Sequence, residues 1–184
     1  MALWKNGRFV EDLFQRIADA DDLPASGGVL VSLDRYRRER EPLLARGAPL
    51  GVVIPPGADW SDLIAELPRL ALVAADLPKF ADGRAFSIGR LLRDRDGFAG
   101  ELRAVGGFFL DQIPLLARVG FDAFSTEDPL VIKGLAEGRW PEVRDYLQPV
   151  SDRNEQSAGH RPWARRPRAE EGGIAAGLAE AAAS

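Results

Sequence analysis

The sequence predicts an α/β fold: a single domain with about five mainly parallel strands and crossover helices. Five short apolar runs have the length and composition of buried strands, and they cover residues 29–33, 50–54, 70–75, 100–105 and 121–124. The segments between them are too long for hairpin turns, which favours parallel pairing through right-handed crossovers. An open doubly wound sheet and a partial β/α barrel both satisfy this pattern. Both architectures bind ligands at the carboxyl ends of their strands.

The segments between the strand runs have the spacing of apolar residues that is typical of helices. In residues 85–94, for example, Ala85, Ile88 and Leu92 share one side of a helix. Predicted helices cover residues 34–41, 59–68, 85–94, 108–119, 127–136 and 141–147. A small N-terminal hairpin is also expected, because Asn6-Gly7 is the dipeptide that most readily forms a type I′ turn.

The composition of the chain changes after Val150. With 184 residues, 46% of them hydrophobic, the chain is long enough for one packed core, which we assign to residues 1–150. Residues 151–184 are polar, then rich in Arg and Pro, then low-complexity Ala and Gly. Such a segment buries too little apolar surface to order itself, so we expect a flexible tail. Contact of its arginines and Trp163 with nucleic acid or a partner protein is a less favoured alternative.

Composition and charge exclude several classes of function. The chain has no cysteine, which excludes disulfides, cysteine-held iron–sulfur clusters and Cys-based zinc sites. The single histidine, His160, lies in the tail, so the core has no base for a Ser-His-Asp hydrolase and no metal site is expected. A net charge of −4 disfavours nucleic acid and anionic membranes as partners. No apolar run approaches the roughly 18 residues of a membrane span, and no secretory signal is seen. We expect a cytoplasmic protein.

The densest group of charged and glycine residues follows the strand runs 70–75 and 100–105. Lys79 and Arg84, together with the Gly106-Gly107 pair, form a chemically reasonable anion site, because glycines before a helix let backbone N–H groups approach an oxyanion. The other residues that we place at this predicted pocket are Asp76, Asp82, Ser87, Asp111 and Gln112. The simpler alternative, in which Gly106-Gly107 forms a tight turn and Asp82-Gly83 belongs to an ordinary loop, is favoured over the anion site. The standard dinucleotide and P-loop glycine motifs do not occur in the chain.

Arg103 lies inside a predicted strand, where a buried cation is costly unless an acid pairs with it. Asp76, Glu101 and Asp122 are its predicted partners, and a structural ion pair is the favoured interpretation. A role in binding the anion is the alternative. Asp76, Asp82 and Arg103 are the candidate catalytic residues, because a carboxylate pair can act as acid and base when its spacing is right.

Several of these residues belong to a longer pattern that resembles a known family. The pattern comprises Lys79-Phe80, Asp82-Gly83-Arg84, Ser87, Arg90, Leu92-Arg93, Gly100 to Ala104, Gly106, Asp111-Gln112, Arg118 and Gly120-Phe121-Asp122. It is similar to the bacterial domain of unknown function DUF934, and the likeness extends over most of residues 1–150. Members are commonly labelled as oxidoreductases or as proteins linked to sulfite reduction, because they accompany sulfite reductase and sulfate-assimilation enzymes.

The resemblance implies a pathway more than a mechanism, since it carries over no catalytic residues. Sulfite reduction requires haem, iron–sulfur or flavin chemistry, and a chain without cysteine and with one tail histidine lacks the usual ligands for the first two. We therefore expect an accessory protein that binds a small anion or sulfite reductase itself. The alternative is a cofactor-free enzyme acting on a sulfate- or phosphate-bearing metabolite. The sequence identifies no cofactor and no oligomeric state.

Overall fold

A computed structural model describes residues 1–79, 82–139, 147, 155–158 and 161–167, and its main feature is one eight-stranded sheet. The strand order is β2-β1-β8-β7-β6-β5-β4-β3. The strands are β1 (Ala2–Lys5), β2 (Arg8–Val10), β3 (Phe14–Arg16), β4 (Gly28–Ser32), β5 (Leu50–Ile54), β6 (Leu72–Leu77), β7 (Glu101–Gly106) and β8 (Ala123–Thr126). Strands β3 to β8 are parallel to one another, whereas β1 is antiparallel to both of its neighbours, β8 and β2.

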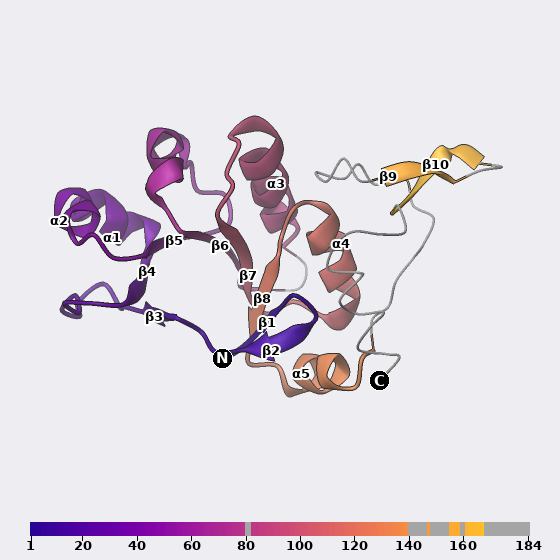
Figure 1. Cartoon of the computed structure of the whole chain (residues 1–184), viewed down its shortest axis with the longest axis horizontal. Helices are drawn as coiled ribbons and strands as arrows, with labels where there is room; N and C mark the ends of the chain where they lie inside the picture. The colour runs from indigo at the N-terminus through magenta and orange to yellow at the C-terminus, as the bar shows by residue number, and fades with distance from the viewer. Residues whose placement is uncertain (80–81, 140–146, 148–154, 159–160, 168–184) are drawn as a thin grey trace.

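The helices connect the parallel strands in sequential order. They are α1 (Leu33–Arg38), α2 (Arg40–Ala45), η1 (Ser61–Arg69), α3 (Arg84–Arg90), η2 (Leu91–Arg95), η3 (Leu110–Gln112), α4 (Ile113–Arg118) and α5 (Pro129–Ala136). Because β3 to β8 follow one another without a reversal, each right-handed crossover passes over the same face of the sheet. Figure 1 shows α1 to α4 on that common side, and α5 beside β2. The architecture is therefore the partial barrel and not the doubly wound sheet.

Both faces of the parallel strands are buried. Residues such as Val31, Val52 and Val73 pack under the helices in the main core. Residues that alternate with them face the inside of the curl and form a second, smaller core, made of Leu30, Val53, Leu72, Ala74 and Val105 with Phe14 packed against them. Burial on both faces explains why these strands are continuous apolar runs in the sequence.

A three-residue connection requires the sheet to curl. Strand β2 is one edge of the sheet and β3 is the other, yet only residues 11–13 join them. Eight strands laid flat would separate the outer two by about 34 Å. The step from Val10 to Phe14 spans at most about 14 Å even when fully extended. The two edges must therefore approach each other, which produces the curled half-barrel.

The structure corrects the predicted number of strands. Eight strands form the sheet instead of about five, and the sheet is partly antiparallel. The predicted hairpin is confirmed, with positive φ at both Asn6 and Gly7, but its strand β1 joins the main sheet next to β8. Strand β3 was not predicted, because three residues are too few to establish a pattern.

The remaining differences concern helices and the C-terminal segment. The predicted helix 59–68 is the 3₁₀ helix η1, and helix 108–119 begins later, as η3 followed by α4. Helix 141–147 lies, apart from Leu147, outside the described residues. In the predicted tail, β9 (Glu155–Ala158) and β10 (Arg161–Pro167) form an antiparallel pair that the sequence did not suggest. The flexibility of residues 151–184 and the domain boundary at Val150 stay predictions.

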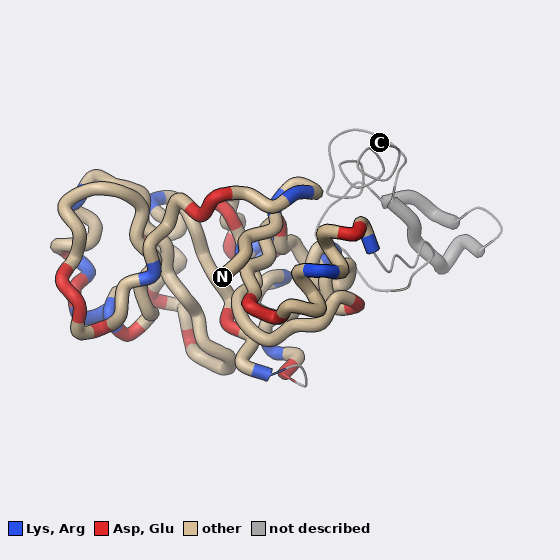
Figure 2. The backbone as a smooth tube through the Cα atoms, turned by 90° about the horizontal axis from the view of Figure 1, so that it is seen from below, with Lys and Arg blue, Asp and Glu red and all other residues tan. Residues whose placement is uncertain are grey.

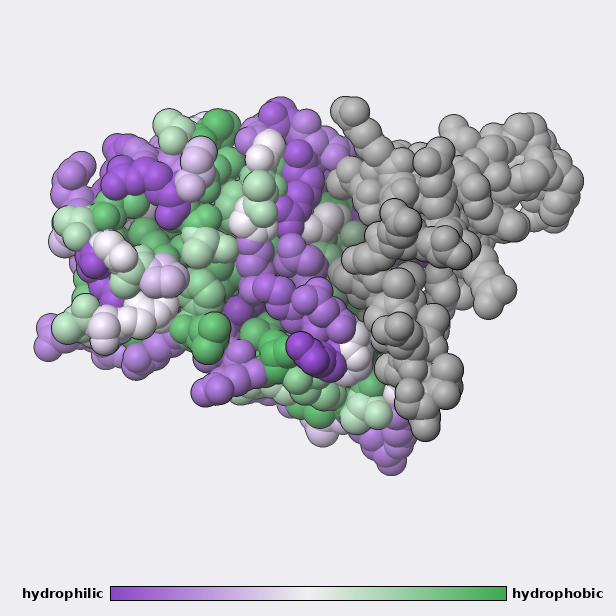
Figure 3. All heavy atoms as spheres, viewed as in Figure 1, coloured by the Kyte–Doolittle hydropathy of each residue, from purple (hydrophilic) through white to green (hydrophobic). Residues whose placement is uncertain are grey.

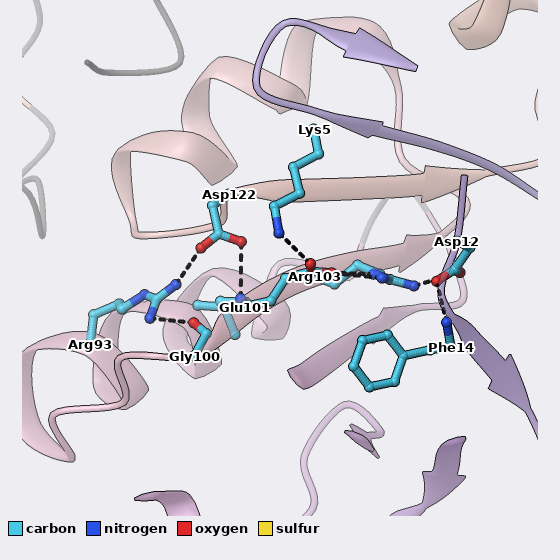
Figure 4. A network of polar contacts seen from close by, with 9 residues as sticks. Lys5, Asp12, Phe14, Arg93, Gly100, Glu101, Arg103 and Asp122 are labelled. Atoms are coloured by element: carbon cyan, nitrogen blue, oxygen red, sulfur yellow. Dashed lines mark hydrogen bonds and ion pairs between the residues drawn. The ribbon is translucent and has the colours of Figure 1, made fainter. Parts of the chain in front are cut away.

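Arg103 links residues 11–13, which connect the two edges of the sheet, to strand β7 inside the barrel (Figure 4). Only 1% of its surface is exposed. Its Nε donates to Glu101 Oε1 and its Nη1 to Asp12 Oδ2, both at 2.7 Å. Lys5 Nζ, two strands away, donates to the other oxygen of Glu101 at 2.6 Å. The guanidinium also lies 5.8 Å from the centre of the Phe14 ring.

These contacts decide between the two interpretations of Arg103. Glu101 was one of its predicted partners, whereas Asp12 was not expected, because no local pattern indicates that residues 11–13 cross the barrel. The predicted partner Asp122 instead accepts from Arg93 at 2.8 Å and from the backbone of Leu102 at 3.0 Å. Asp76 makes no ion pair with Arg103 in the described structure. Arg103 is therefore a buried structural cation.

Replacing Arg103 with Ala is expected to destabilise the protein by about 3 kcal/mol, because it leaves Glu101 and Asp12 without their buried partner. Urea denaturation followed by circular dichroism measures this loss. Arg84→Ala is the matched control, since Arg84 is largely exposed and its partner among the described residues is the neighbouring Asp82; its unfolding midpoint should hardly change. Equal midpoints for the two variants would contradict the structural role of Arg103.

The adjacent Gly106 and Gly107 allow a second test of the fold. Gly106 has φ +113°, and a Cβ there would lie 2.5 Å from the carbonyl oxygen of Leu77. A Cβ on Gly107 would stay 3.6 Å from that oxygen. Gly106→Ala should therefore lower the free energy of unfolding by about 2 kcal/mol, and Gly107→Ala by no more than about 0.5 kcal/mol. Thermal melts of both variants measure the difference, and equal losses would show that this bend tolerates a side chain.

Candidate functional site

A hollow of about 510 Å³ lies at the carboxyl ends of β3, β4, β5 and β6. Its wall contains the last residues of two strands, Arg16 of β3 and Ser32 of β4. Pro55, directly after β5, and Asp76, near the end of β6, complete this side. Parallel α/β folds bind ligands at this edge, since side chains from several strand ends converge there while the strands themselves stay rigid. The hollow is therefore the candidate site.

Three charged side chains of the hollow, those of Arg16, Asp21 and Asp76, make no hydrogen bond or ion pair with another residue in the described part of the chain. Arg16 and Asp76 belong to strands, whereas Asp21 lies in the exposed loop after β3. Partial burial raises the pKa of the Asp76 carboxyl, and the positive charge of Arg16 opposes that shift. A half-buried carboxyl without a partner is costly for the fold. It is a feature typical of ligand sites, where the missing partner belongs to the ligand.

The loop after β3 brings Asp19 and Asp21 to the hollow, and helix α1, which follows β4, brings Asp34. Asp19 accepts from Ser32 Oγ at 2.7 Å and from Arg38 at 3.0 Å. These hydrogen bonds lower the pKa of the Asp19 carboxyl. Asp19 and Asp76 therefore line one hollow with pKa values shifted in opposite directions. In such a pair, the carboxyl with the lowered pKa stays ionised and the one with the raised pKa is the better proton donor.

Arg35 holds this loop in place. It is 3% exposed, and its Nη2 donates to the carbonyl oxygen of Asp21 at 2.7 Å while Nη1 donates to that of Ala18. Its Nε bonds Glu39 at 3.1 Å. Ser32 is the N-cap of α1, the helix that carries Arg35, and its Oγ accepts a hydrogen bond from the backbone N–H of Arg35 at 3.0 Å. Helix α1 and the loop thus form one rigid rim.

Asp76 is the predicted site residue that lines the hollow. Its neighbours in the predicted pocket are placed differently. Asp82 and Arg84 pair with each other at 2.6 Å, and the hydrogen bonds from Arg84 lower the pKa of Asp82 to about 2. The guanidinium of Arg84 is thereby committed to a carboxylate, and its side chain is 63% exposed. Lys79 is exposed beyond the end of β6.

The other predicted residues surround the same strand ends without lining the hollow. Gly106 lies next to Asp76, since a Cβ on it would be 3.3 Å from Asp76 Oδ1. Gly107 donates its backbone N–H to Leu77 at 2.7 Å. Ser87 and Asp111 are exposed, and the side chain of Gln112 accepts from the backbone of Phe109 at 3.0 Å. The structure therefore does not gather Lys79, Arg84 and Arg103 into one group.

Four residues of the hollow, Arg16, Asp19, Asp21 and Asp34, were not among the predicted site residues. Arg16 ends β3, which was not predicted, and the three aspartates follow β3 and β4. The sequence contained little signal for them, because Phe14-Gln15-Arg16-Ile17 does not alternate between apolar and polar residues as a longer half-buried strand does.

Figure 2 shows acidic and basic positions interspersed along the described chain. On the face shown in Figure 3, hydrophilic and hydrophobic residues are likewise intermixed. Within the described ranges, no group of three or more His, Asp or Glu side chains is arranged to hold a metal ion. The helices of the described chain are also too short and too polar to cross a membrane.

Comparison with known proteins identifies the family. No curated protein matches the chain. Residues 51–155 match the family described as a bacterial protein of unknown function, DUF934. The match covers more than half of the sequence and includes β5 to β8, and so the carboxyl ends of β5 and β6 at the hollow. The chain belongs to DUF934, a family of bacterial proteins of unknown function.

Proposed function

We propose that this protein is a cytoplasmic accessory protein of assimilatory sulfite and sulfate reduction that binds a small oxyanion in the hollow and works beside sulfite reductase. The pathway comes from the family resemblance. The type of ligand comes from one observation, namely that Arg16 lies at the carboxyl ends of parallel strands without a partner among the described residues. A guanidinium in this position presents a planar set of N–H donors that fits an oxyanion.

Asp76 supports the same ligand when its carboxyl is protonated. Burial already raises its pKa, and a bound anion raises it further because like charges disfavour ionisation. A neutral carboxyl donates one hydrogen bond to an oxyanion, whereas an ionised one repels it. Arg16 and Asp76 together then supply a cation and a neutral donor.

The acidic residues around the hollow are mostly compensated. Asp19 is bonded to Ser32 and Arg38, and Asp34 lies 3.9 Å from the guanidinium of Arg37. Their charges therefore oppose an incoming anion less than their number suggests. Asp21, at the exposed rim of the hollow, is the acidic residue whose carboxyl has no such partner among the described residues.

Sulfate binding should depend on Arg16 and on pH. Arg16→Ala is expected to weaken binding about 10- to 100-fold, the usual effect of losing a charged hydrogen bond. Affinity of the unaltered protein should fall by up to about tenfold per pH unit as Asp76 ionises. Asp76→Asn, which cannot ionise, should bind with little dependence on pH. Isothermal titration calorimetry with sodium sulfate between pH 5 and 8 measures all three, because sulfate keeps its charge over this range.

Two exposed residues outside the hollow provide controls for this titration. Arg8 lies on the edge strand β2 and Asp111 lies in η3. Arg8→Ala and Asp111→Asn should leave the affinity and its pH dependence unchanged. Sulfate binding that is insensitive to Arg16, or absent altogether, would refute the oxyanion site.

Association with the reductase is a separate expectation. We expect the full-length protein to form a complex with purified sulfite reductase, detectable by analytical size-exclusion chromatography and by light scattering. Bovine serum albumin at equal concentration is the negative control. Separate elution of the two proteins at tens of micromolar would contradict the accessory role while leaving the oxyanion site open.

The opposite pKa shifts of Asp19 and Asp76 favour one alternative, a cofactor-free enzyme that acts on a sulfate- or phosphate-bearing metabolite at the same hollow. In that case Asp76 is the proton donor and Asp19 stays ionised. Turnover of such a metabolite that disappears in Asp76→Asn but persists in Asp111→Asn would distinguish the enzyme from the accessory protein.

A further inference from the structure

The hollow is larger than a free oxyanion requires. Its volume of about 510 Å³ falls within the range of roughly 300–1,000 Å³ that binds metabolite-sized molecules. A sulfate or sulfite ion at Arg16 would fill a small part of this space. The hollow therefore has room for an organic body attached to the oxyanion.

We propose that the ligand is a sulfate monoester of a polyhydroxylated molecule, such as a sulfated sugar. This inference rests on the proposed oxyanion site and specifies its ligand. Arg16 binds the sulfate group, and the carboxylates of the rim accept hydrogen bonds from the hydroxyl groups of the body.

The balance of charge selects a single negative charge on the ligand. Among the described residues that line the hollow, Arg16 is the one cation. Asp76 is the neutral donor once the anion is bound, so the carboxyl group that has no cationic partner among these residues is that of Asp21. A phosphate monoester carries close to two negative charges at pH 7, whereas a sulfate monoester carries one. The single charge is matched by Arg16, and a second charge would meet the carboxyl group of Asp21.

The carboxylates at the rim of the hollow, those of Asp19, Asp21 and Asp34, favour a ligand that carries hydrogen-bond donors. An ionised carboxylate only accepts hydrogen bonds, and hydroxyl groups supply the donors without adding charge. Asp21 is well placed for this role, since its backbone is held on both sides: its N–H donates to Ala18 at 3.1 Å and its carbonyl accepts from Arg35 at 2.7 Å. Ile17, Val53 and Pro55 add apolar surface for the carbon skeleton.

The test compares four probes by isothermal titration calorimetry: glucose 6-sulfate, glucose 6-phosphate, glucose and inorganic sulfate. Glucose 6-sulfate is expected to bind at least about tenfold more tightly than each of the other three. Arg16→Ala should abolish this preference over glucose. Asp21→Asn should weaken the sulfate ester about three- to tenfold and leave inorganic sulfate unchanged. Asp22→Asn, an exposed neighbour that does not line the hollow, is the matched control.

The outcomes separate this inference from the proposed function. Arg16-dependent binding of inorganic sulfate with no gain from the sugar would overturn the ester and support the oxyanion site. Glucose 6-phosphate binding as tightly as the sulfate ester would overturn the selection for a single charge. Tight binding of the ester without measurable binding of inorganic sulfate would support the ester and contradict the small-ion role. Binding of none of the probes would overturn both.

Discussion

The short connection from β2 to β3 is the constraint on which the rest of this fold depends. Residues 11–13 join the two edges of the eight-stranded sheet, so the sheet curls and the strands acquire an inner face. Arg103 bonds Asp12 in that connection and Glu101 on its own strand. A buried, fully paired cation is weak evidence for extra stability in general, but here it fixes the path of the connection across the barrel. The curvature then brings the ends of β3 and β6 to one hollow.

The same curvature explains which charged residues are available to a ligand. Arginines on the helices and on the inner face have carboxylate partners close in space, as Arg37 has Asp62 and Arg93 has Asp122. Arg16 is different because β3 is a three-residue edge strand whose end projects beyond these networks. Asp76 is different because the residue opposite it on β7, Val105, is apolar and the nearby Gly106 has no side chain. A cation and a carboxyl that the fold leaves unpaired at strand ends are the chemical basis of the proposed site.

Several predictions from sequence agree with the structure for reasons that are local. The strand runs were recognisable because burial on both faces makes them continuously apolar, and the Asn6-Gly7 turn because positive φ at two positions requires these residue types. Asp76 was identified because it directly follows an apolar run. Arg84 and Asp82 were expected to face a ligand, but two residues this close in sequence pair with each other. Their spacing carries no information about which partner each will choose.

The sequence by itself determined the α/β class, the family and the edge of the sheet at which polar residues accumulate. These properties depend on composition and on residue spacing along the chain, which a linear pattern records. Only the tertiary structure decided that the sheet curls, that Asp12 pairs with Arg103 and that Arg16 faces Asp76. Each of these depends on contacts between segments far apart in sequence, about 60 to 90 residues apart for the two pairs of side chains. Such contacts follow from strand order and curvature, which no local pattern encodes.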